Sequence, residues 1–343
     1  MLTIGSHTIG PGHPAFIIAE AGVNHNGDVQ RAHDLIDAAA DAGADAVKFQ
    51  TFSPKMIAAP EAERAAYQIA TTGEGGSQLD MLEKLVLPAE AYSGLMQHAS
   101  ERGLIFLSTP FDPGSADFLD ELGLPAFKVS SGDVTNTPFL EFLATKGKPV
   151  LLSTGMANMD EVSRAVASIN KAPLALFQCV SNYPSAPSHS NLHVMATLRE
   201  TFDCPVGWSD HTQGITVSIA AAALGAELLE KHFTLDRHLS GPDHQASLEP
   251  DELRAMVTAV RDAEASLGDG LKKPVPEEEP VAKVARRSLY WAQELVAGTV
   301  VRAEHLMALR PGTGISPEMQ RDLIGRKLAR DVQGMMMVRE RDI

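Results

Sequence analysis

The chain has 343 residues, and 44% of them are apolar, which is enough for a large buried core. Acidic residues outnumber basic ones by 44 to 29, a formal charge of −15. Binding a phosphate backbone needs a basic face, so we expect no nucleic acid partner. No apolar run reaches the ~20 residues of a membrane span, so we expect no membrane partner either.

The first residues and the cysteines indicate a cellular compartment. Residues 1–16 lack the basic and apolar segments of a secretion signal. The only cysteines are Cys179 and Cys204, too few for a disulfide framework. We therefore expect a cytoplasmic protein.

The chain begins with an alternating segment over residues 2–13, which predicts a hairpin placed to plug the bottom of a barrel. Eight short apolar runs then end in polar residues, and a helix-like stretch usually follows. The predicted strands are 16–20, 45–50, 104–109, 126–130, 149–153, 174–179, 205–209 and 228–233. The predicted helices are 30–42, 89–102, 114–122, 138–147, 159–170, 191–200, 214–224 and 250–267.

Helix start and stop signals agree with this order. Asp112-Pro113 and Thr137-Pro138 combine a capping residue with a first-turn proline, and glycines such as Gly43 stand where helices should end. Alternating strands and helices predict a parallel sheet with right-handed crossovers. Eight such units predict an α/β fold of the (β/α)₈ barrel type. A doubly wound sheet is disfavoured because no G-x-G-x-x-G follows the first strand.

Two segments interrupt the pattern. Residues 53–88, with GEGGS at 73–77, are too long for a plain loop and predict a lid or substrate-binding segment. Residues 268–282 have the Gly, Pro and charge content of a linker. We therefore predict a catalytic barrel over residues 1–267 and a separate small unit over 283–343.

Two lysines stand at strand ends, where barrels of this type place their chemistry. Lys48 and Lys128 are each flanked by apolar residues, so a buried anionic partner is expected, although a solvated strand end is the alternative. Gln50 shares a strand face with Lys48. A single lysine would also suit a Schiff base, but two favour phosphate or carboxylate binding. Hydroxyl groups that could join them belong to Thr109, Ser130, Ser131, Ser153 and Ser209.

His211 and His232 end the last two predicted strands, which are neighbours in a barrel. Their imidazoles either converge on a divalent metal or are satisfied by backbone carbonyls; imidazole suits Mn, Fe, Co or Zn better than Mg. Glu20, on the adjoining first strand, is either a third group near that metal or the ion-pair partner of Lys48.

Asp133 follows the fourth strand and has two interpretations, a helix cap or an acid/base and sugar-hydroxyl contact. Asp243 lies on the same face after the eighth strand. The segment NHNGD (24–28) is predicted to be structural, with Asp28 capping the first helix. His238 and His244 are predicted surface residues.

The order of motifs along the whole chain resembles the sialic acid synthase family, which includes N-acetylneuraminate, legionaminate and related nonulosonate synthases. The motifs are AEAGVNHNGD (19–28), ADAVKFQTF (starting at 44), STPFD (108–112), FKVSSGD (127–133), LLSTGM (151–156), GWSDHT (207–212), EKHFTLDR (230–237), GPDHQASLEP (241–250), RRSL (286–289) and LRPGTG (309–314). Residues 283–343 resemble the family's β-rich SAF, or antifreeze-like, domain.

The resemblance implies that the protein condenses phosphoenolpyruvate with an open-chain N-acyl amino sugar and releases phosphate. It implies a swapped homodimer in which the SAF domain caps the partner's barrel. It also implies a divalent metal on His211 and His232, commonly Mn²⁺ with Mg²⁺ or Co²⁺ as alternatives, and Glu20 close to the reacting carbons. The implied phosphoenolpyruvate contacts are Lys48, Gln50, Thr109, Lys128, Ser131, Ser153 and Ser209. The implied sugar contacts are Tyr183, Asp243 and Arg310, the last inserted into the other subunit's site.

The residue at position 133 bears on the sugar. Acetylneuraminate enzymes typically carry Glu where this chain has Asp133, and the shorter side chain resembles the legionaminate branch. The implied sugar is a 2,4-diacetamido-trideoxy hexose, with N-acetylmannosamine as the alternative. Two other classes of function stay open, a Schiff-base aldolase using Lys48 or Lys128 and a non-enzymatic carbohydrate-binding protein using residues 283–343.

Overall fold

The computed structural model describes residues 1–73, 76–170 and 172–343, so Glu74 and Gly75 of the GEGGS segment lie outside the described residues. The chain divides into two compact units, Met1–Gly268 and Asp269–Ile343. Within the described part of the chain, no helix is both long and apolar enough to cross a membrane.

The first unit is built on an eight-stranded parallel sheet with the order β5-β4-β3-β10-β9-β8-β7-β6. The end strands β5 and β6 contact each other, so the sheet closes on itself and the predicted barrel is confirmed. The strands are β3 (Phe16–Gly22), β4 (Ala46–Thr51), β5 (Ile105–Pro110), β6 (Phe127–Val129), β7 (Val150–Ser153), β8 (Leu174–Cys179), β9 (Val206–Asp210) and β10 (Leu228–His232).

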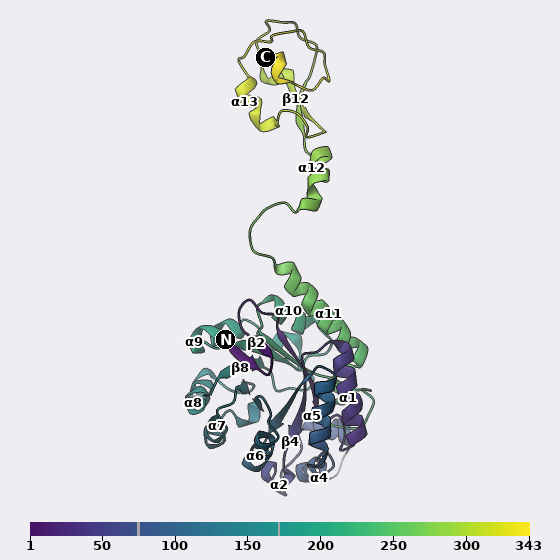
Figure 1. Cartoon of the computed structure of the whole chain (residues 1–343), viewed down its shortest axis with the longest axis vertical. Helices are drawn as coiled ribbons and strands as arrows, with labels where there is room; N and C mark the ends of the chain where they lie inside the picture. Colours follow the sequence, from purple (N-terminus) through teal and green to yellow (C-terminus); the bar gives the residue numbers. More distant parts are fainter. Residues whose placement is uncertain (74–75, 171) are drawn as a thin grey trace. The chain divides into compact units, whose positions relative to one another are not determined.

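A helix follows each strand and packs outside the barrel (Figure 1). The outer helices are α1 (Val29–Ala42), α5 (Ala91–Glu101), α6 (Pro113–Glu121), α7 (Thr137–Ala144), α8 (Met159–Ile169), α9 (Val194–Phe202), α10 (Thr216–Ala223) and α11 (Pro250–Leu267). Asp28 caps α1 and Asp112 caps α6, as expected. The predicted cap Thr137 is wrong by one residue, because Asn136 is the N-cap and Thr137 already has helical backbone.

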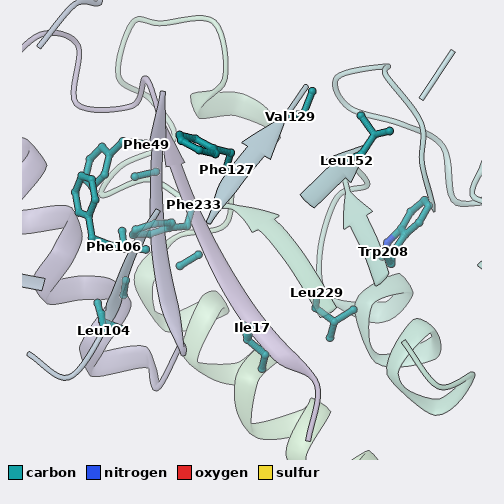
Figure 2. Close-up of a cluster of buried hydrophobic side chains, with 14 of the residues drawn as sticks. Ile17, Phe49, Leu104, Phe106, Phe127, Val129, Leu152, Trp208, Leu229 and Phe233 are labelled. Carbon is teal, nitrogen blue, oxygen red and sulfur yellow. The ribbon is translucent and has the colours of Figure 1, made fainter. Parts of the chain in front are cut away.

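The apolar core forms on both faces of the barrel wall. On the outer face, side chains such as Phe49, Phe106 and Trp208 pack between the strands and the helices (Figure 2). On the inner face, the antiparallel hairpin of β1 (Leu2–Ile4) and β2 (His7–Ile9) buries its apolar residues against the amino-terminal halves of the strands. The predicted hairpin and its position inside the barrel are therefore confirmed.

The long segment between β4 and α5 contains α2 (Pro54–Ile57), α3 (Ala66–Thr72) and α4 (Gln78–Glu83). Met81 and Leu85 pack with Val23 and Phe52, which follow β3 and β4. This segment therefore lies at the carboxyl ends of those strands, where a lid is expected.

The second unit has its own small core. It contains an antiparallel pair, β11 (Ser288–Trp291) and β12 (Leu306–Leu309). Isolated bridges pair Tyr290 of β11 with Met337, Leu295 with Val332 and Val300 with Lys327. Trp291 is fully buried and donates from its indole nitrogen to Asp342, 3.3 Å away. This unit also contains α12 (Glu279–Ala285), which begins within the predicted linker, and α13 (Gln320–Leu323).

Candidate active site

A cavity of about 410 Å³ lies at the carboxyl ends of the barrel strands. Successive side chains of a strand point to opposite faces, so Ser209 and His211 enter the cavity together, as do Glu230 and His232. The predicted site residues that line it are Glu20, Lys48, Gln50, Thr109, Lys128, Ser131, Ser153, Tyr183, Ser209, His211, His232 and Asp243.

Two predicted residues do not line this cavity. Asp133 belongs to the 3₁₀ turn Ser131–Asp133, next to the lining residue Gly132, and accepts a hydrogen bond of 3.0 Å from the side-chain amide of Asn136. Burial raises the pKa of Asp133. Arg310 lies in the second unit at the end of β12, where it is exposed.

Lys48 occupies the centre of a buried charge cluster. Its ammonium nitrogen lies 2.7 Å from Glu20 Oε2 and 3.7 Å from Glu230 Oε2, and it donates to Thr109 Oγ1 at 3.1 Å. Glu20 also accepts from Gln50 at 3.3 Å. The expected anionic partner of Lys48 is therefore present, and the solvated alternative is wrong because the lysine is 2% exposed.

Lys128 lies near the other carboxylate oxygen of Glu230. It donates to Ser153 Oγ at 2.7 Å and lies 3.5 Å from Glu230 Oε1, with its charge 5.3 Å from the centre of the Phe177 ring. Ser209 donates to the same Glu230 oxygen at 3.0 Å. Glu230 therefore joins both lysines in one network.

Burial and charge set the protonation of this cluster. Burial raises the pKa of Glu20 to about 7, although Lys48 opposes the shift. Burial acts in the same direction on Glu230, but Lys128 and Lys48 outweigh it and lower the pKa of that carboxyl. Burial lowers the pKa of Lys128, whereas Glu20 and Glu230 overcome burial and raise the pKa of Lys48. The cluster thus combines a fixed carboxylate with one that titrates near neutrality.

Ser131 is held in place by its neighbours at the cavity wall. Its hydroxyl accepts from the backbone N–H of Gly155 at 2.9 Å and lies 3.1 Å from the sulfur of Cys179. A Cβ at position 155 would lie 2.8 Å from that sulfur and 2.9 Å from the hydroxyl oxygen. Only glycine therefore lets the chain approach this closely.

His211 and His232 converge as predicted, with ring centres 5.5 Å apart. His211 donates from Nδ1 to the carbonyl of Val180 at 2.6 Å, which leaves its Nε2 as a free acceptor. Burial lowers the pKa of His211 to about 4 and takes that of His232 well below its usual value, so both rings are neutral.

These histidines fit a divalent metal. Neutral imidazole is the ligand form, and a ligand histidine commonly donates its other nitrogen to a carbonyl, as His211 does. His232 Nδ1 is buried with no hydrogen-bond partner among the described residues. Over the described ranges, no group of three or more His, Cys, Asp or Glu side chains could hold a metal. Glu20 Oε2 lies 2.7 Å from the ammonium nitrogen of Lys48.

A buried ion pair outside the barrel fixes the strands that carry the histidines. Asp210 and Lys231 precede His211 and His232 in the chain and point to the opposite face of their strands. The Lys231 ammonium nitrogen lies 3.1 Å from Asp210 Oδ2, and both side chains are fully buried. Asp210 also accepts from Thr212 and Ser218, each at 2.7 Å. Lys231 donates to the backbone carbonyl of Thr212 as well.

Two site features were not predicted. Glu230 was missed, although its spacing of two residues from His232 places both on one face of a strand. The prediction that His244 lies on the surface is wrong: it is fully buried, with Nδ1 2.7 Å from Thr234 Oγ1. His238 is exposed as expected. Asp243 is 8% exposed, and burial raises its pKa to about 6.

The fold and the cavity define a TIM-barrel protein that holds lysines, hydroxyl groups and two neutral imidazoles in one site. The family model described as the NeuB family matches residues 35–272, and the chain belongs to this family.

Known proteins resemble the chain over most of its length. The N,N'-diacetyllegionaminic acid synthase of Campylobacter jejuni is 43% identical, covering 94% of this chain and 98% of that protein. The synthase of the same name from Legionella pneumophila is 44% identical, covering 92% and 90%. The crystal structure of N-acetylneuraminic acid (sialic acid) synthetase from Leptospira borgpetersenii superimposes with a TM-score of 0.71 at 35% identity, covering 82% of this chain and 94% of that one.

Proposed function

We propose that this protein condenses phosphoenolpyruvate with an open-chain N-acyl amino sugar, giving a nine-carbon nonulosonic acid and phosphate. The favoured product is N,N'-diacetyllegionaminate, the product named for two relatives. The observation that carries the proposal is one cavity that holds Lys48 and Lys128 beside the neutral pair of His211 and His232. N-acetylneuraminate is the second candidate product, supported by the likeness to the Leptospira synthetase.

The lysines and hydroxyl groups are proposed to hold phosphoenolpyruvate. Lys48 and Lys128 are neutralised by Glu20 and Glu230, so an entering anion shares cations that are already oriented. The cradle comprises Lys48, Gln50, Thr109, Lys128, Ser131, Ser153 and Ser209. Fixed donors of this kind stabilise the negative charge on the departing phosphate more effectively than water does.

The reaction forms one carbon–carbon bond and one carbon–oxygen bond to water, and it breaks the carbon–oxygen bond to phosphate. The third carbon of phosphoenolpyruvate attacks the sugar aldehyde, whose oxygen takes a proton, and positive charge develops at the second carbon. Water adds there, and the resulting hemiketal phosphate loses phosphate to leave a keto acid. Glu20, whose pKa is about 7, is proposed to accept the proton of that water, because a general base works best near the ambient pH.

His211 and His232 are proposed to hold a divalent metal, Mn²⁺ in the first instance with Mg²⁺ or Co²⁺ as alternatives. When bound, such an ion supplies Lewis-acid polarisation of the aldehyde. The histidines remain neutral at physiological pH and keep the free nitrogen that this role requires. Their orientation is maintained by the Val180 carbonyl and by the outer Asp210–Lys231 pair.

The sugar is proposed to contact Tyr183 and Asp243, which line the cavity, and Asp133, which lies beside the lining residue Gly132. The Tyr183 ring lies 4.1 Å from the His211 ring, so it covers the side of the proposed metal site. Residues 283–343 are proposed to form a SAF domain that places Arg310 in the barrel of a second copy, within a swapped homodimer. The two cysteines are free thiols, which fits a reducing cytoplasm.

The decisive experiment measures phosphate release from phosphoenolpyruvate over a panel of amino sugars with Mn²⁺. We expect turnover with 2,4-diacetamido-2,4,6-trideoxymannose, loss of turnover after chelation, and inactivity of His211→Ala. Preferential turnover of N-acetylmannosamine would select the second product. Chelator-resistant activity with borohydride trapping at Lys48 or Lys128 would overturn the proposal in favour of a Schiff-base aldolase.

The swapped dimer has its own test. Arg310→Ala and His211→Ala subunits are each expected to be inactive, yet mixed subunits should regain partial activity because one barrel receives both residues intact. Heterodimers that form but stay inactive would contradict the swap. If residues 283–343 bind glycans while the whole protein never turns over, the non-enzymatic alternative is favoured.

A further inference from the structure

The NHNGD segment (24–28) between β3 and α1 does more than begin a helix. Asp28 alone makes the cap, accepting from the backbone N–H groups of Gln30 and Arg31. Asn24 and His25, which take no part in that cap, are 1% and 0% exposed although they lie in a loop. Asn24 Oδ1 and His25 Nε2 have no hydrogen-bond partner among the described residues, so the role of the segment follows from the bonds that its other polar atoms make.

Asn24 reaches the loop that follows β10. Its amide nitrogen donates to the Phe233 carbonyl at 2.8 Å and to Ser247 Oγ at 3.0 Å. The Ser247 hydroxyl in turn donates to the backbone carbonyl of Asp243 at 2.7 Å. The Asn24 side chain therefore connects the two ends of residues 233–247, and the Ser247 hydroxyl extends this connection to the backbone of Asp243.

Asn26 holds the middle of the same loop. Its amide nitrogen donates to the Ser240 carbonyl at 2.8 Å, and its oxygen accepts from His244 Nε2 at 3.2 Å. Burial lowers the pKa of His244 to about 4, so this ring is neutral and has one donor and one acceptor nitrogen. The acceptor nitrogen faces Thr234 Oγ1, so both ring nitrogens are used.

Gly241 shows how closely the loop packs on these groups. A Cβ at this position would lie 2.6 Å from His244 Cδ2 and 2.9 Å from Asn26 Oδ1. The loop therefore packs on His244 and Asn26 at a position where a side chain would not fit, and the hydrogen bonds from Asn24 and Asn26 hold it there. Pro242 and Asp243, the next two residues, line the active-site cavity.

We propose that Asn24 and Asn26 are positioning residues for Asp243: they hold residues 233–247 at both ends and in the middle, so that the Asp243 carboxylate faces the sugar. This inference rests on the proposed function, because it takes Asp243 as a sugar contact. Asn26 also lines a neighbouring cavity of about 700 Å³, so its direct contact with the sugar is the alternative that the experiment must separate.

The test uses Asn26→Asp, which keeps the oxygen that faces His244 but loses the donor to Ser240. Asp also tolerates the left-handed backbone of this position, where φ is 51°. We expect the KM for the sugar to rise about tenfold, as for one lost hydrogen bond, while the KM for phosphoenolpyruvate changes less than about twofold. In an Asp243→Asn background the same change should add nothing, because a residue that acts through Asp243 has no effect once that carboxylate is gone.

Asp28→Ala is the matched control from the same segment. It removes the α1 cap and lowers thermal stability, but it should leave both KM values unchanged. Hydrogen exchange should accelerate over residues 236–247 in Asn26→Asp and over 29–42 in Asp28→Ala. Additive effects of Asn26→Asp and Asp243→Asn, or a similar rise in sugar KM in Asp28→Ala, would overturn the positioning role. If the wild type shows no synthase turnover, the proposed function fails, and the exchange pattern alone decides whether the clamp exists.

Discussion

The two ends of the same barrel differ in what fills them. At the amino ends of the strands, Leu2, Ile4 and Ile9 of the hairpin pack in one cluster with apolar residues such as Ala46 and Leu228. Two residues further along the same inward faces, Glu20, Lys48, Lys128 and Glu230 form a charged network. One set of strands thus supports two interiors of opposite chemistry.

This difference teaches that stability and chemistry are separated along the barrel axis. The amino end gains free energy from burial of apolar area, whereas the carboxyl end buries charges whose desolvation cost is offset only by their pairing. Changes at the amino end should therefore alter unfolding without altering chemistry. Changes at the carboxyl end should do the reverse, or should alter both.

The largest expected effect is at the charged end. Lys48→Met should reduce phosphate release by about 10²–10³-fold, the usual cost of losing one fixed donor to a developing charge. It also leaves Glu20 without its closest cation. Initial-rate assays at saturating sugar measure the loss, with Lys273→Met, an exposed lysine of the second unit, as the control. Activity within tenfold of wild type would contradict the placement of the chemistry at the charged end of the barrel.

At the apolar end, Ile9→Ala should lower the free energy of unfolding by about 2–5 kcal/mol, because a fully buried side chain leaves a cavity. Turnover per folded molecule should stay unchanged. Urea denaturation and rate measurements on the same sample test both statements. Leu224→Ala, at an exposed position, should cost less than about 0.5 kcal/mol. A large fall in turnover would show that the two ends are coupled.

The pH dependence of stability sharpens the contrast. The pKa of Glu20 rises from 4.5 to about 7 on folding. The stability that the protonated Glu20 carboxyl contributes to the folded state is therefore fully present below pH 4.5 and is lost as the pH rises through 7. Glu20→Gln should therefore gain roughly 3 kcal/mol relative to wild type between pH 4.5 and 7. Folding lowers the pKa values of His25 and His211 to about 4, so their contribution to the free energy of unfolding increases as the pH rises. Both histidines are present in Glu20→Gln and in the wild type, so this contribution cancels when the two proteins are compared.

Ile9→Ala supplies the reference for that measurement, since it removes no titrating group. Its destabilisation should be constant over the same pH range. Urea denaturation at several pH values gives both curves. A constant difference between Glu20→Gln and wild type would mean that the carboxyl does not titrate near neutrality.

The smallest effect concerns the metal. At about one hundred times its Kd, Mn²⁺ should stabilise the protein by about 2.7 kcal/mol, because only the folded chain brings the two histidines together. Thermal denaturation with and without Mn²⁺ measures this shift, which His232→Ala should lose and Ile9→Ala should keep. Equal stabilisation of His232→Ala would place the ion elsewhere.

Most of the barrel could be predicted because its signals are local. Alternating apolar runs mark the strands, and capping pairs such as Asp112-Pro113 mark helix starts, so the described elements lie within a few residues of the expected ones. The convergence of His211 and His232 followed from the order of neighbouring strands alone.

The remaining features depend on contacts that are distant in the sequence. His244 is buried and contacts Asn26, more than two hundred residues earlier, and no local pattern indicates that contact. Glu230 had a local signal in its spacing from His232, but its role depends on two lysines from other strands. The expected roles of Asp133 and Arg310 depend on the substrate and on a second copy, and they stay predictions.

The outward pair of Asp210 and Lys231 constrains how this site can diverge. Asp210 and Lys231 each adjoin a histidine in the chain. Removing either Asp210 or Lys231 leaves the other as an unpaired buried charge, at a cost of about 3–5 kcal/mol. A lineage that changes its metal preference at His211 or His232 must therefore keep the pair or replace both members at once. Designed libraries that randomise the histidines should hold these two positions fixed.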